Sequence, residues 1–353
     1  MSVADAAPEL SAIVCTHNGA GTLATALESL ARQTLPATRY EVIVVDDGST
    51  DDTAGVAAAA GARVITLRPN AGLAAARNAG VSAARGAIVA FTDDDCEADP
   101  GWATTLLQAF ADPAVDGAGG RVVPDSPNPF VRRFLTAHNP LVPLGDDLLE
   151  SSAAGHRLLL YVRRTVLGKV EPRDRLYAVV GANMAFRREL VYELGGFDEE
   201  FRFGAEEEDL CLRAHARPGG ARIAYVPTAE VRHWFHDRVG DSVRRARAYG
   251  RGNARRALKH PQTKLIVYPA PVAVAALVSA AALTRRTGLL AVAALVPLLA
   301  YPGWVRLVAS EAAAESLGHP FLQLAQETAA MVGELDGLRA GYRRVPSRHL
   351  IDA

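Results

Sequence analysis

Apolar and polar positions alternate in blocks along the first hundred residues. Four short apolar runs end at polar or turn-forming residues, a pattern that predicts buried strands. The runs occupy residues 10–16, 40–45, 62–67 and 87–91. Segments with apolar residues at helical spacing lie between them, at residues 22–33, 53–60 and 73–84. Strands that alternate with helices in this way predict an α/β fold with a mostly parallel sheet and right-handed crossovers.

Polar clusters follow three of these strands. They are Thr16–His17–Asn18, Asp46–Asp47 and Asp93–Asp94–Asp95. The carboxyl ends of parallel strands share one edge of a sheet, where open α/β folds bind ligands. Three adjacent carboxylates repel one another, and a divalent cation such as Mg²⁺ or Mn²⁺ is the simplest reason to gather them. A solvated acidic turn explains the triplet taken alone, but three converging polar ends favour a binding site.

Composition and charge exclude several classes of protein. The formal net charge of −1 gives no reason to expect nucleic-acid binding. The three cysteines, Cys15, Cys96 and Cys211, are far apart in sequence, which fits a reducing compartment and argues against a zinc cluster or a disulfide framework.

The chain lacks the glycine-rich motifs that hold a dinucleotide or a P-loop phosphate. A bound nucleotide would therefore need a metal ion and basic side chains to neutralise its diphosphate. Arg77, on the helix expected after Gly72, is one candidate. The alternative for Arg77 is a solvated cation on the helix surface.

The last third of the chain differs in character. Residues 265–284 carry no charged side chain, and residues 287–305 nearly repeat this pattern, so two membrane-crossing helices are expected. A buried helix pair, or a shallow re-entrant hairpin with Arg285 and Arg286 at the lipid surface, remains an alternative. Basic residues precede the first apolar span, as is typical of segments that face anionic lipids on the cytoplasmic side. They are Arg244, Arg245, Arg247, Arg251, Arg255, Arg256, Lys259 and Lys264.

A mixed helix is expected over residues 321–340. One apolar stripe along it suits an interface or a contact with the N-terminal domain. The stripe comprises Phe321, Leu324, Ala325, Thr328, Val332 and Leu335.

Several motifs in register resemble the family 2 glycosyltransferases of GT-A fold. In chain order they are Val14–Asn18, Val45–Ser49, Asn70–Asn78, Asp93–Asp95, Gly181–Arg187, Gly195–Asp198, Glu206–Leu210 with Arg213, and Val231–His233. The resemblance covers roughly residues 10 to 235. It implies a nucleotide-diphospho-sugar transferase fold in which the first strand ends hold a nucleotide sugar.

The resemblance implies a role for each matching residue. Thr16 and Asn18 would line the base pocket and Asp47 would bind the edge of the base. Arg77, Asp94 and Asn183 would also contact the nucleotide sugar, with Asp94 the least certain of the acidic triplet. Asp95 would bind Mg²⁺ or Mn²⁺ directly, Asp93 would be shared between the metal and the ribose, and His233 would be a further metal ligand. The residues expected to bind the nucleotide sugar or the metal are therefore Thr16, Asn18, Asp47, Arg77, Asp93, Asp94, Asp95, Asn183 and His233.

The acidic stretch Glu206–Glu207–Glu208–Asp209 would supply the general base. Its second position, Glu207, matches the family's base but is usually aspartate, so the choice between Glu206 and Glu207 stays open. The alternative is a charged helix start, with acids favoured by the helix dipole and Asp209 paired with Arg213 one turn later.

We therefore expect a membrane-anchored, metal-dependent inverting glycosyltransferase of the cell inner membrane with its catalytic domain in the cytoplasm. Its donor would be a nucleotide-diphosphate sugar, and its acceptor a lipid-linked or cell-envelope glycan. The expected divisions are a flexible tail (1–9), the GT-A domain (10–240), a basic juxtamembrane segment (241–264), a transmembrane helical hairpin (265–306) and an amphipathic segment (307–353). A nucleotidyltransferase acting on a sugar phosphate, a processive polysaccharide synthase and a non-catalytic membrane scaffold are the alternatives. This chain shows neither the early basic glycine-rich loop expected of the first nor the Q-x-x-R-W motif expected of the second.

Overall fold

The computed structural model of the protein describes residues 7–142, 144–145, 175–235, 238–265, 267–304, 314–343 and 347–350. Residues 1–6 of the expected flexible tail lie outside the described residues, as do residues 305–313 at the end of the expected hairpin.

An eight-stranded sheet forms the centre of the N-terminal part, in the order β3-β2-β1-β4-β9-β6-β10-β5. Its strands are β1 (Leu10–Thr16), β2 (Tyr40–Asp46), β3 (Arg63–Thr66), β4 (Ile88–Asp93), β5 (Cys96–Ala98), β6 (Gly117–Asp125), β9 (Asn183–Arg187) and β10 (Ile223–Trp234). A separate two-stranded sheet pairs β7 (Leu144–Gly145) with β8 (Leu176–Ala178).

The first half of the sheet is parallel and the second half is mixed. Strands β3, β2, β1 and β4 run parallel, as the alternation of strands and helices predicts. Strand β9 is antiparallel to both β4 and β6, and β5 is antiparallel to β10. The register pairs Thr16 with Asp46 and Cys15 with Asp93. The three polar strand ends therefore meet at one edge, as predicted.

Helices cover both faces of the sheet because its strands are apolar on both sides. Along β1, Leu10, Ala12 and Val14 enter one buried core, whereas Ile13 and Cys15 enter the other. Alternating side chains of a strand point to opposite faces, so one run supplies both cores. The helices are α1 (Leu23–Ala31), α2 (Thr53–Ala59), α3 (Leu73–Ala83), α4 (Trp102–Ala109), α5 (Pro129–Ala137), α7 (Arg188–Glu193) and α8 (Glu206–Ala216).

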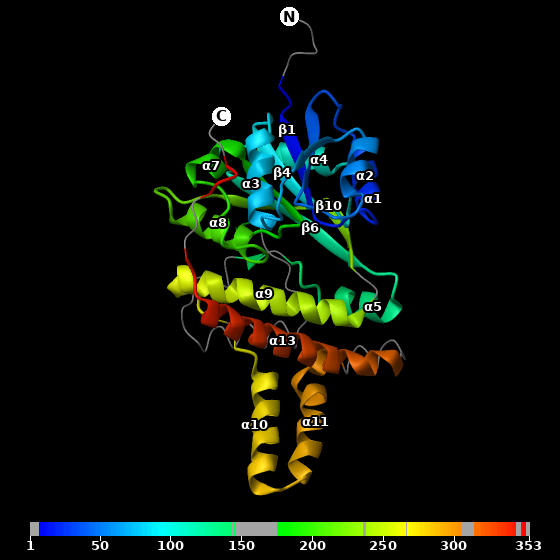
Figure 1. The fold of residues 1–353 in the computed structure, drawn as a ribbon, viewed down its shortest axis with the longest axis vertical. Coiled ribbons are helices and arrows are strands. Elements are labelled where there is room, and N and C mark those ends of the chain that lie inside the picture. Colours follow the sequence, from blue (N-terminus) through cyan, green and yellow to red (C-terminus); the bar gives the residue numbers. More distant parts are fainter. Residues whose placement is uncertain are drawn as a thin grey trace, which may run out of the picture.

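Two long helices cross beneath the sheet (Figure 1), α9 (Val239–Lys259) and α13 (His319–Ala340). They pack backbone against backbone through glycines. A Cβ added to Gly250 would lie 2.0 Å from the Ala330 carbonyl oxygen, and one added to Gly333 would lie 2.0 Å from the Arg247 carbonyl oxygen. No larger residue fits either position, so the two helices form one layer.

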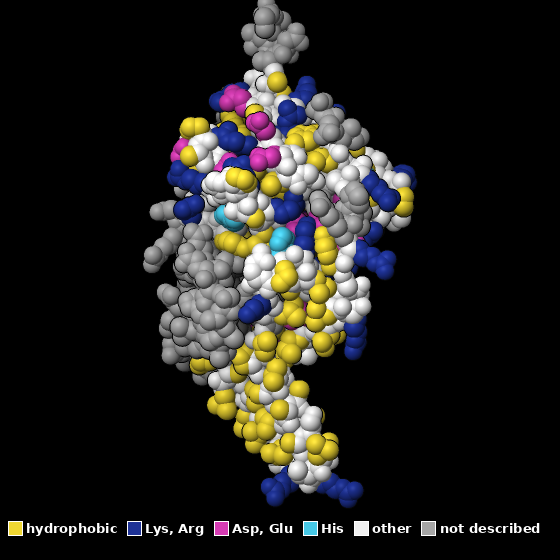
Figure 2. All heavy atoms as spheres, turned by 90° about the vertical axis from the view of Figure 1, so that its left-hand side faces the viewer, with side chains coloured by type: hydrophobic (Ala, Val, Ile, Leu, Met, Phe, Trp, Pro, Cys, Tyr) yellow, Lys and Arg dark blue, Asp and Glu magenta, His cyan; other side chains and the backbone are white. Residues whose placement is uncertain are grey.

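A helical hairpin projects from this layer, away from the sheet (Figure 1). It consists of α10 (Pro269–Thr284) and α11 (Gly288–Ala300). Figure 2 shows apolar side chains over much of its surface and basic side chains at its tip. The exposed apolar residues include Val272, Val278, Leu283, Leu290, Val292, Leu295 and Leu299.

Both hairpin helices are shorter than the sequence predicts. Helix α10 has 16 residues, which at 1.5 Å each gives about 24 Å, less than the roughly 30 Å of a hydrocarbon core. It starts at Pro269 and ends where Arg285 takes a left-handed conformation, while Pro297 interrupts α11 near its end. Among the residues that the structure describes, no helix combines the length and hydropathy needed to cross a membrane.

The basic residues before the hairpin have acidic partners within the protein. Most of them lie on α9 and pair with carboxylates of the protein, such as Arg247 with Asp336 and Arg256 with Glu208. A run of arginines looks the same in sequence whether its partners are phosphates or acids from distant segments, so a lipid-facing role for this segment stays a prediction.

Helix α13 presents a different face to α9 than its apolar stripe predicts. Phe321, Val332 and Leu335 of the stripe are exposed, whereas Ala330 and Gly333 are buried. Small residues occupy the contact because the glycine packing brings the two backbones together, which leaves the apolar stripe on the outer surface.

Candidate active site

A cavity of about 450 Å³ lies at the carboxyl edge of the parallel strands. It is lined by the ends of β1, β2, β4 and β10, the start of α3, the loop and first turn of α8, and one face of α9, together with Leu141 and residues 180–182. The cavity therefore combines the predicted strand ends with residues more than a hundred positions further along the chain.

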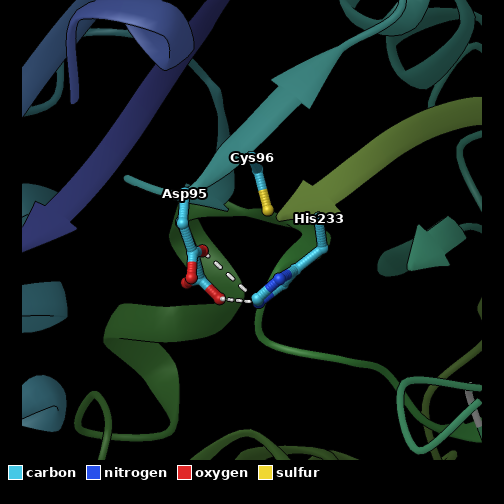
Figure 3. Close-up of side chains that lie close together, drawn as sticks. Asp95, Cys96 and His233 are labelled. Carbon is cyan, nitrogen blue, oxygen red and sulfur yellow. Dashed lines mark ion pairs between the residues drawn. The ribbon is translucent and has the colours of Figure 1, made fainter. Parts of the chain in front are cut away.

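Three side chains that are able to bind a cation meet on one wall of the cavity. His233 on β10 lies opposite Cys96 of β5 in the antiparallel ladder, which places it beside the acidic turn. Its Nε2 atom lies 3.4 Å from Asp95 Oδ1 and 3.9 Å from Asp93 Oδ2. Figure 3 shows the Asp95 carboxylate and the His233 ring turned toward one another. One potential ligand atom from each of Asp93, Asp95, Cys96 and His233 lies within 4.8 Å of the others.

The electrostatics of this cluster fit a divalent cation. Burial raises the pKa of Asp93, and the neighbouring Asp95 charge raises it further. Burial also raises the pKa of Asp94 to about 7, although the Thr16 hydroxyl donates a hydrogen bond to its carboxylate. Carboxylate oxygens and an imidazole nitrogen suit Mg²⁺ or Mn²⁺, and a bound cation would relieve the repulsion.

Arg77 is buried rather than solvated. Only 2% of it is exposed, and its Nη1 atom donates to Glu206 Oε1 at 2.6 Å. Its guanidinium lies over the rings of Phe91 and Phe197, 6.0 and 5.6 Å from their centroids. The sequence did not predict this pair because its members are 129 positions apart.

Gly181 makes room for this arginine. A Cβ at position 181 would lie 2.3 Å from Arg77 Nη2. The glycine is thus required by the buried ion pair that lines the cavity.

Glu207 differs from Glu206 although both line the cavity. Among the described residues, Glu206 Oε2 and Glu207 Oε2 are both buried without a hydrogen-bond partner, but Glu206 is also held by an ion pair through its Oε1. Burial raises the pKa of Glu207 to about 8, and the adjacent Glu206 charge adds to this rise. The two neighbouring acids therefore differ in their surroundings, because Glu206 pairs with Arg77 while burial and the Glu206 charge raise the pKa of Glu207.

Asp209, further along α8, is fully buried, but basic side chains around it balance its negative charge. It accepts from Arg213 Nε at 2.9 Å and from His260 Nε2 at 2.7 Å, and its Oδ1 lies 2.7 Å from Lys259 Nζ. Burial alone would raise the pKa of Asp209, but the His260 hydrogen bond and the Arg213 and Lys259 charges hold it at about 2. The expected Asp209–Arg213 pair is present, as part of this larger cluster.

Thr16 and Asp47 line the cavity, as the resemblance implies. However, the Asp47 carboxylate already accepts from the backbone amides of Ala71 and Gly72, at 2.7 and 2.8 Å, and from the side chain of Asn70. Asp47 therefore shapes the loop before α3 at the same time as it faces the cavity.

Asn18 and Asn183 do not line the cavity. The Asn18 side chain accepts from the Thr50 backbone amide at 2.8 Å. The Asn183 amide group donates to the carbonyls of Arg121 and Ala229 and accepts from the Trp102 indole, all inside the sheet. This placement argues against the predicted contact of Asn183 with the nucleotide sugar, because its side chain is fully occupied within the protein.

Several lining residues were missed by the sequence reasoning. Arg202 and Phe203 come from the loop before α8, and Arg245 and Tyr249 from α9. Phe203 is 41% exposed and stacks on Tyr249, with ring centroids 5.6 Å apart. The one sequence signal for α9 was the four-residue spacing of Arg245 and Tyr249, which places them on one helix face.

Comparisons with known proteins agree with this architecture. The model of the family described as "Glycosyl transferase family 2" matches residues 11–195. The pre-mycofactocin glycosyltransferase of Mycobacterium tuberculosis is 33% identical over 227 residues, which cover 62% of this chain and 43% of that protein. The validoxylamine A glucosyltransferase of Streptomyces hygroscopicus subsp. jinggangensis is 38% identical over 233 residues, 59% of this chain and 52% of that protein. The chain thus spans about half the length of these curated relatives.

A solved structure shares the fold over nearly the whole chain. It is the mannosyltransferase PcManGT from Pyrobaculum calidifontis, in complex with GDP-Man and Mn²⁺. The TM-score is 0.56 at 20% identity, and the match covers 94% of this chain and 88% of that one. The mixed α/β sheet with flanking helices therefore matches the GT-A fold.

Proposed function

The chain belongs to glycosyl transferase family 2, and on this basis we propose that it is a metal-dependent inverting glycosyltransferase. It moves a sugar from a nucleotide-diphosphate sugar to the hydroxyl of an acceptor. The observation that carries the proposal is the meeting, in one cavity, of a cation-binding cluster and an acid with a raised pKa, Glu207. These are the two functions that an inverting transfer requires.

The nucleotide sugar would bind at the end of the cavity where the acidic residues follow the parallel strands. Asp93, Asp95 and His233 would hold the divalent cation, and Thr16 and Asp47 line the cavity beside them. When bound, the cation supplies positive charge that stabilises the departing nucleoside diphosphate.

Glu207 acts as the general base. The acceptor hydroxyl oxygen attacks the anomeric carbon of the donor sugar from the side opposite the diphosphate. Its proton passes to a Glu207 carboxylate oxygen as the bond between the anomeric carbon and the phosphate oxygen breaks. The products are the inverted glycoside and the nucleoside diphosphate. A base with a pKa near 8 accepts a proton efficiently close to neutral pH.

Glu206 serves a different purpose. Its ion pair with Arg77 keeps both side chains fixed behind Glu207. The positive charge of Arg77 also opposes the rise in the Glu207 pKa, so the base deprotonates at a lower pH than burial alone would allow.

The acceptor is a lipid-linked or cell-envelope glycan, and the protein works at the cytoplasmic face of the inner membrane. The apolar hairpin and the outward apolar stripe of α13 support this part of the proposal. The hairpin inserts into the bilayer without either helix matching the full thickness of the hydrocarbon core, since α10, at about 24 Å, is longer than one leaflet but shorter than the roughly 30 Å core. Arg285 and Arg286 between the helices would extend toward lipid headgroups.

Vesicle flotation tests the membrane part. The protein is expected to float with vesicles that contain anionic lipid, and a variant with Leu295→Ser and Leu299→Ser is expected to remain largely in the dense fraction. Equal flotation of the two proteins would contradict insertion of the hairpin. Donor turnover by both proteins controls for folding.

A donor screen tests the catalytic part. Purified protein is incubated with individual nucleotide sugars and Mn²⁺ or Mg²⁺, and nucleoside diphosphate release is measured. We expect release with one donor, and its loss in excess chelator and in Asp95→Ala. Full activity in chelator would exclude the metal assignment. Pyrophosphate release from a nucleoside triphosphate would identify a nucleotidyltransferase instead.

A further inference from the structure

Helix α9 supplies one wall of the cavity, although it lies outside residues 11–195 that match the family model. Arg245 and Tyr249 are four residues apart and face the cavity together. The wall is fixed on the C-terminal side of these two residues, because Gly250 packs on α13 and Arg256 pairs with Glu208 of α8. Arg245 is therefore held in place by the fold rather than carried on a free surface helix.

The Arg245 side chain points at the acidic cluster. Its Nη2 atom lies 3.9 Å from Asp95 Oδ2, and its guanidinium lies over the Phe235 ring at 5.0 Å from the centroid. The side chain is 23% exposed, so it reaches the cavity while most of its surface is covered. The ring and the carboxylate together set the direction of the guanidinium.

Three arginines line the cavity, and two of them are committed elsewhere. Arg77 donates to Glu206, and Arg202 donates to the Asn70 carbonyl and side chain. Among the described residues, Arg245 has no carboxylate or carbonyl within hydrogen-bond distance, since its distance to Asp95 exceeds 3.5 Å. Its side chain forms a hydrogen bond with the Tyr249 side chain and a long ion pair with Asp95, so the guanidinium is held beside the acidic cluster without a close carboxylate partner.

A diphosphate in this cavity faces three aspartates. A single divalent cation offsets only part of that negative charge, so a second positive group is needed beside it. Arginine meets this need well, because its planar guanidinium donates two parallel hydrogen bonds to phosphate oxygens.

We propose that Arg245 binds the diphosphate of the donor and of the nucleoside diphosphate product. This rests on the proposed function, since it assumes a nucleotide-diphosphate sugar as donor. It assigns to α9 the role that the sequence suggested for Arg77. It also makes a residue outside the family motifs part of the donor site.

Calorimetric titration of the full chain with GDP, UDP, dTDP and ADP, each with Mn²⁺, tests the proposal. The tightest of these is then titrated into Arg245→Gln, Arg245→Lys and Arg244→Gln. We expect Arg245→Gln to weaken binding by about 10- to 100-fold, as for loss of a charged hydrogen-bond partner, and Arg245→Lys to weaken it less. The corresponding nucleoside without phosphates should bind equally weakly to all variants.

Arg244→Gln is the matched control. It removes the same charge from the adjacent position, where the side chain is 79% exposed and pairs with Asp241. Unchanged diphosphate affinity in a folded Arg245→Gln or Arg245→Lys variant overturns the proposal. A similar loss in Arg244→Gln also overturns it, because the effect would then be one of net charge. If the unmodified chain binds none of the four diphosphates, the donor class itself is wrong and the inference fails with it.

Discussion

Two buried carboxyl groups on helix α8 have pKa values that are shifted in opposite directions. Glu207 faces the cavity, and burial with the Glu206 charge raises its pKa to about 8. Asp209 faces the contact between α8 and α9, where its pKa is about 2 because His260, Arg213 and Lys259 outweigh the effect of burial. Both acids come from one short acidic stretch, so sequence alone does not separate them.

The difference distinguishes the acid that we propose as the base from an acid with a structural role. Asp209 is buried with its partners, so its charge is balanced and holds two helices together. Glu207 is buried with a carboxyl oxygen that has no partner among the described residues, which is unfavourable in the absence of substrate. An uncompensated acid beside a cation-binding cluster is typical of a catalytic site.

Glu207→Gln tests the carboxyl group that faces the cavity. Of the substitutions in this comparison, it should lower the rate of sugar transfer the most. We expect a roughly 1000-fold lower rate of sugar transfer with little loss of folding, because the amide fits the site but accepts no proton. The measurement is steady-state release of nucleoside diphosphate in the presence of acceptor. In the unmodified protein kcat/KM should fall as the pH drops below about 8, because the base becomes protonated, and this limb should vanish in the variant.

Glu208→Gln is the control on the same helical turn. Glu208 pairs with Arg256 and does not line the cavity. The Glu208→Gln variant should retain most of the rate of sugar transfer. Equal losses in Glu207→Gln and Glu208→Gln would mean that the acidic turn acts through structure and not through proton transfer.

Asp209→Asn tests the contact between α8 and α9. Loss of the Asp209 carboxylate leaves Arg213 and Lys259 without this acidic partner. We therefore expect the free energy of unfolding to fall by about 3 kcal/mol in denaturant titrations near pH 7. The pKa of Asp209 is lowered in the folded state, so its stabilisation is present above pH 4 and is lost as the pH falls toward 2. The deficit of the variant should shrink over that range.

The exposed pair between Arg247 and Asp336 provides a comparison for this measurement. Asp336→Asn should change stability little, because exposed ion pairs contribute little. A larger loss in Asp336→Asn than in Asp209→Asn would reverse the comparison.

The sequence predicted the parallel half of the sheet and the positions of α10, α11 and α13, but it did not predict α9 or the way the C-terminal helices pack. Strand positions and their polar ends follow from a local pattern of apolar runs, and parallel pairing then brings Thr16, Asp47 and Asp93 to one edge. The same argument cannot place α9, since the partners of its arginines lie dozens of positions away.

Individual site residues show the same limit. The environment of Arg77 depends on Glu206, and that of Asn183 depends on Trp102 and two carbonyls from other strands. A motif indicates which residue types occur together, but it does not reveal which side chain is already engaged within the protein. The surroundings of Glu207 and Arg245 therefore became visible only in three dimensions.

The segment of residues 347–350 folds back on the N-terminal domain. Ser347 contacts both Asn78 and Glu199, and the His349 carbonyl accepts from Ser82. The contact between Asn78 and Ser347 joins positions 269 apart in sequence. During synthesis, every family motif therefore leaves the ribosome well before the cavity wall and this contact can form. Shortened chains that end soon after β10 would contain all the motifs, yet would lack the wall that completes the site.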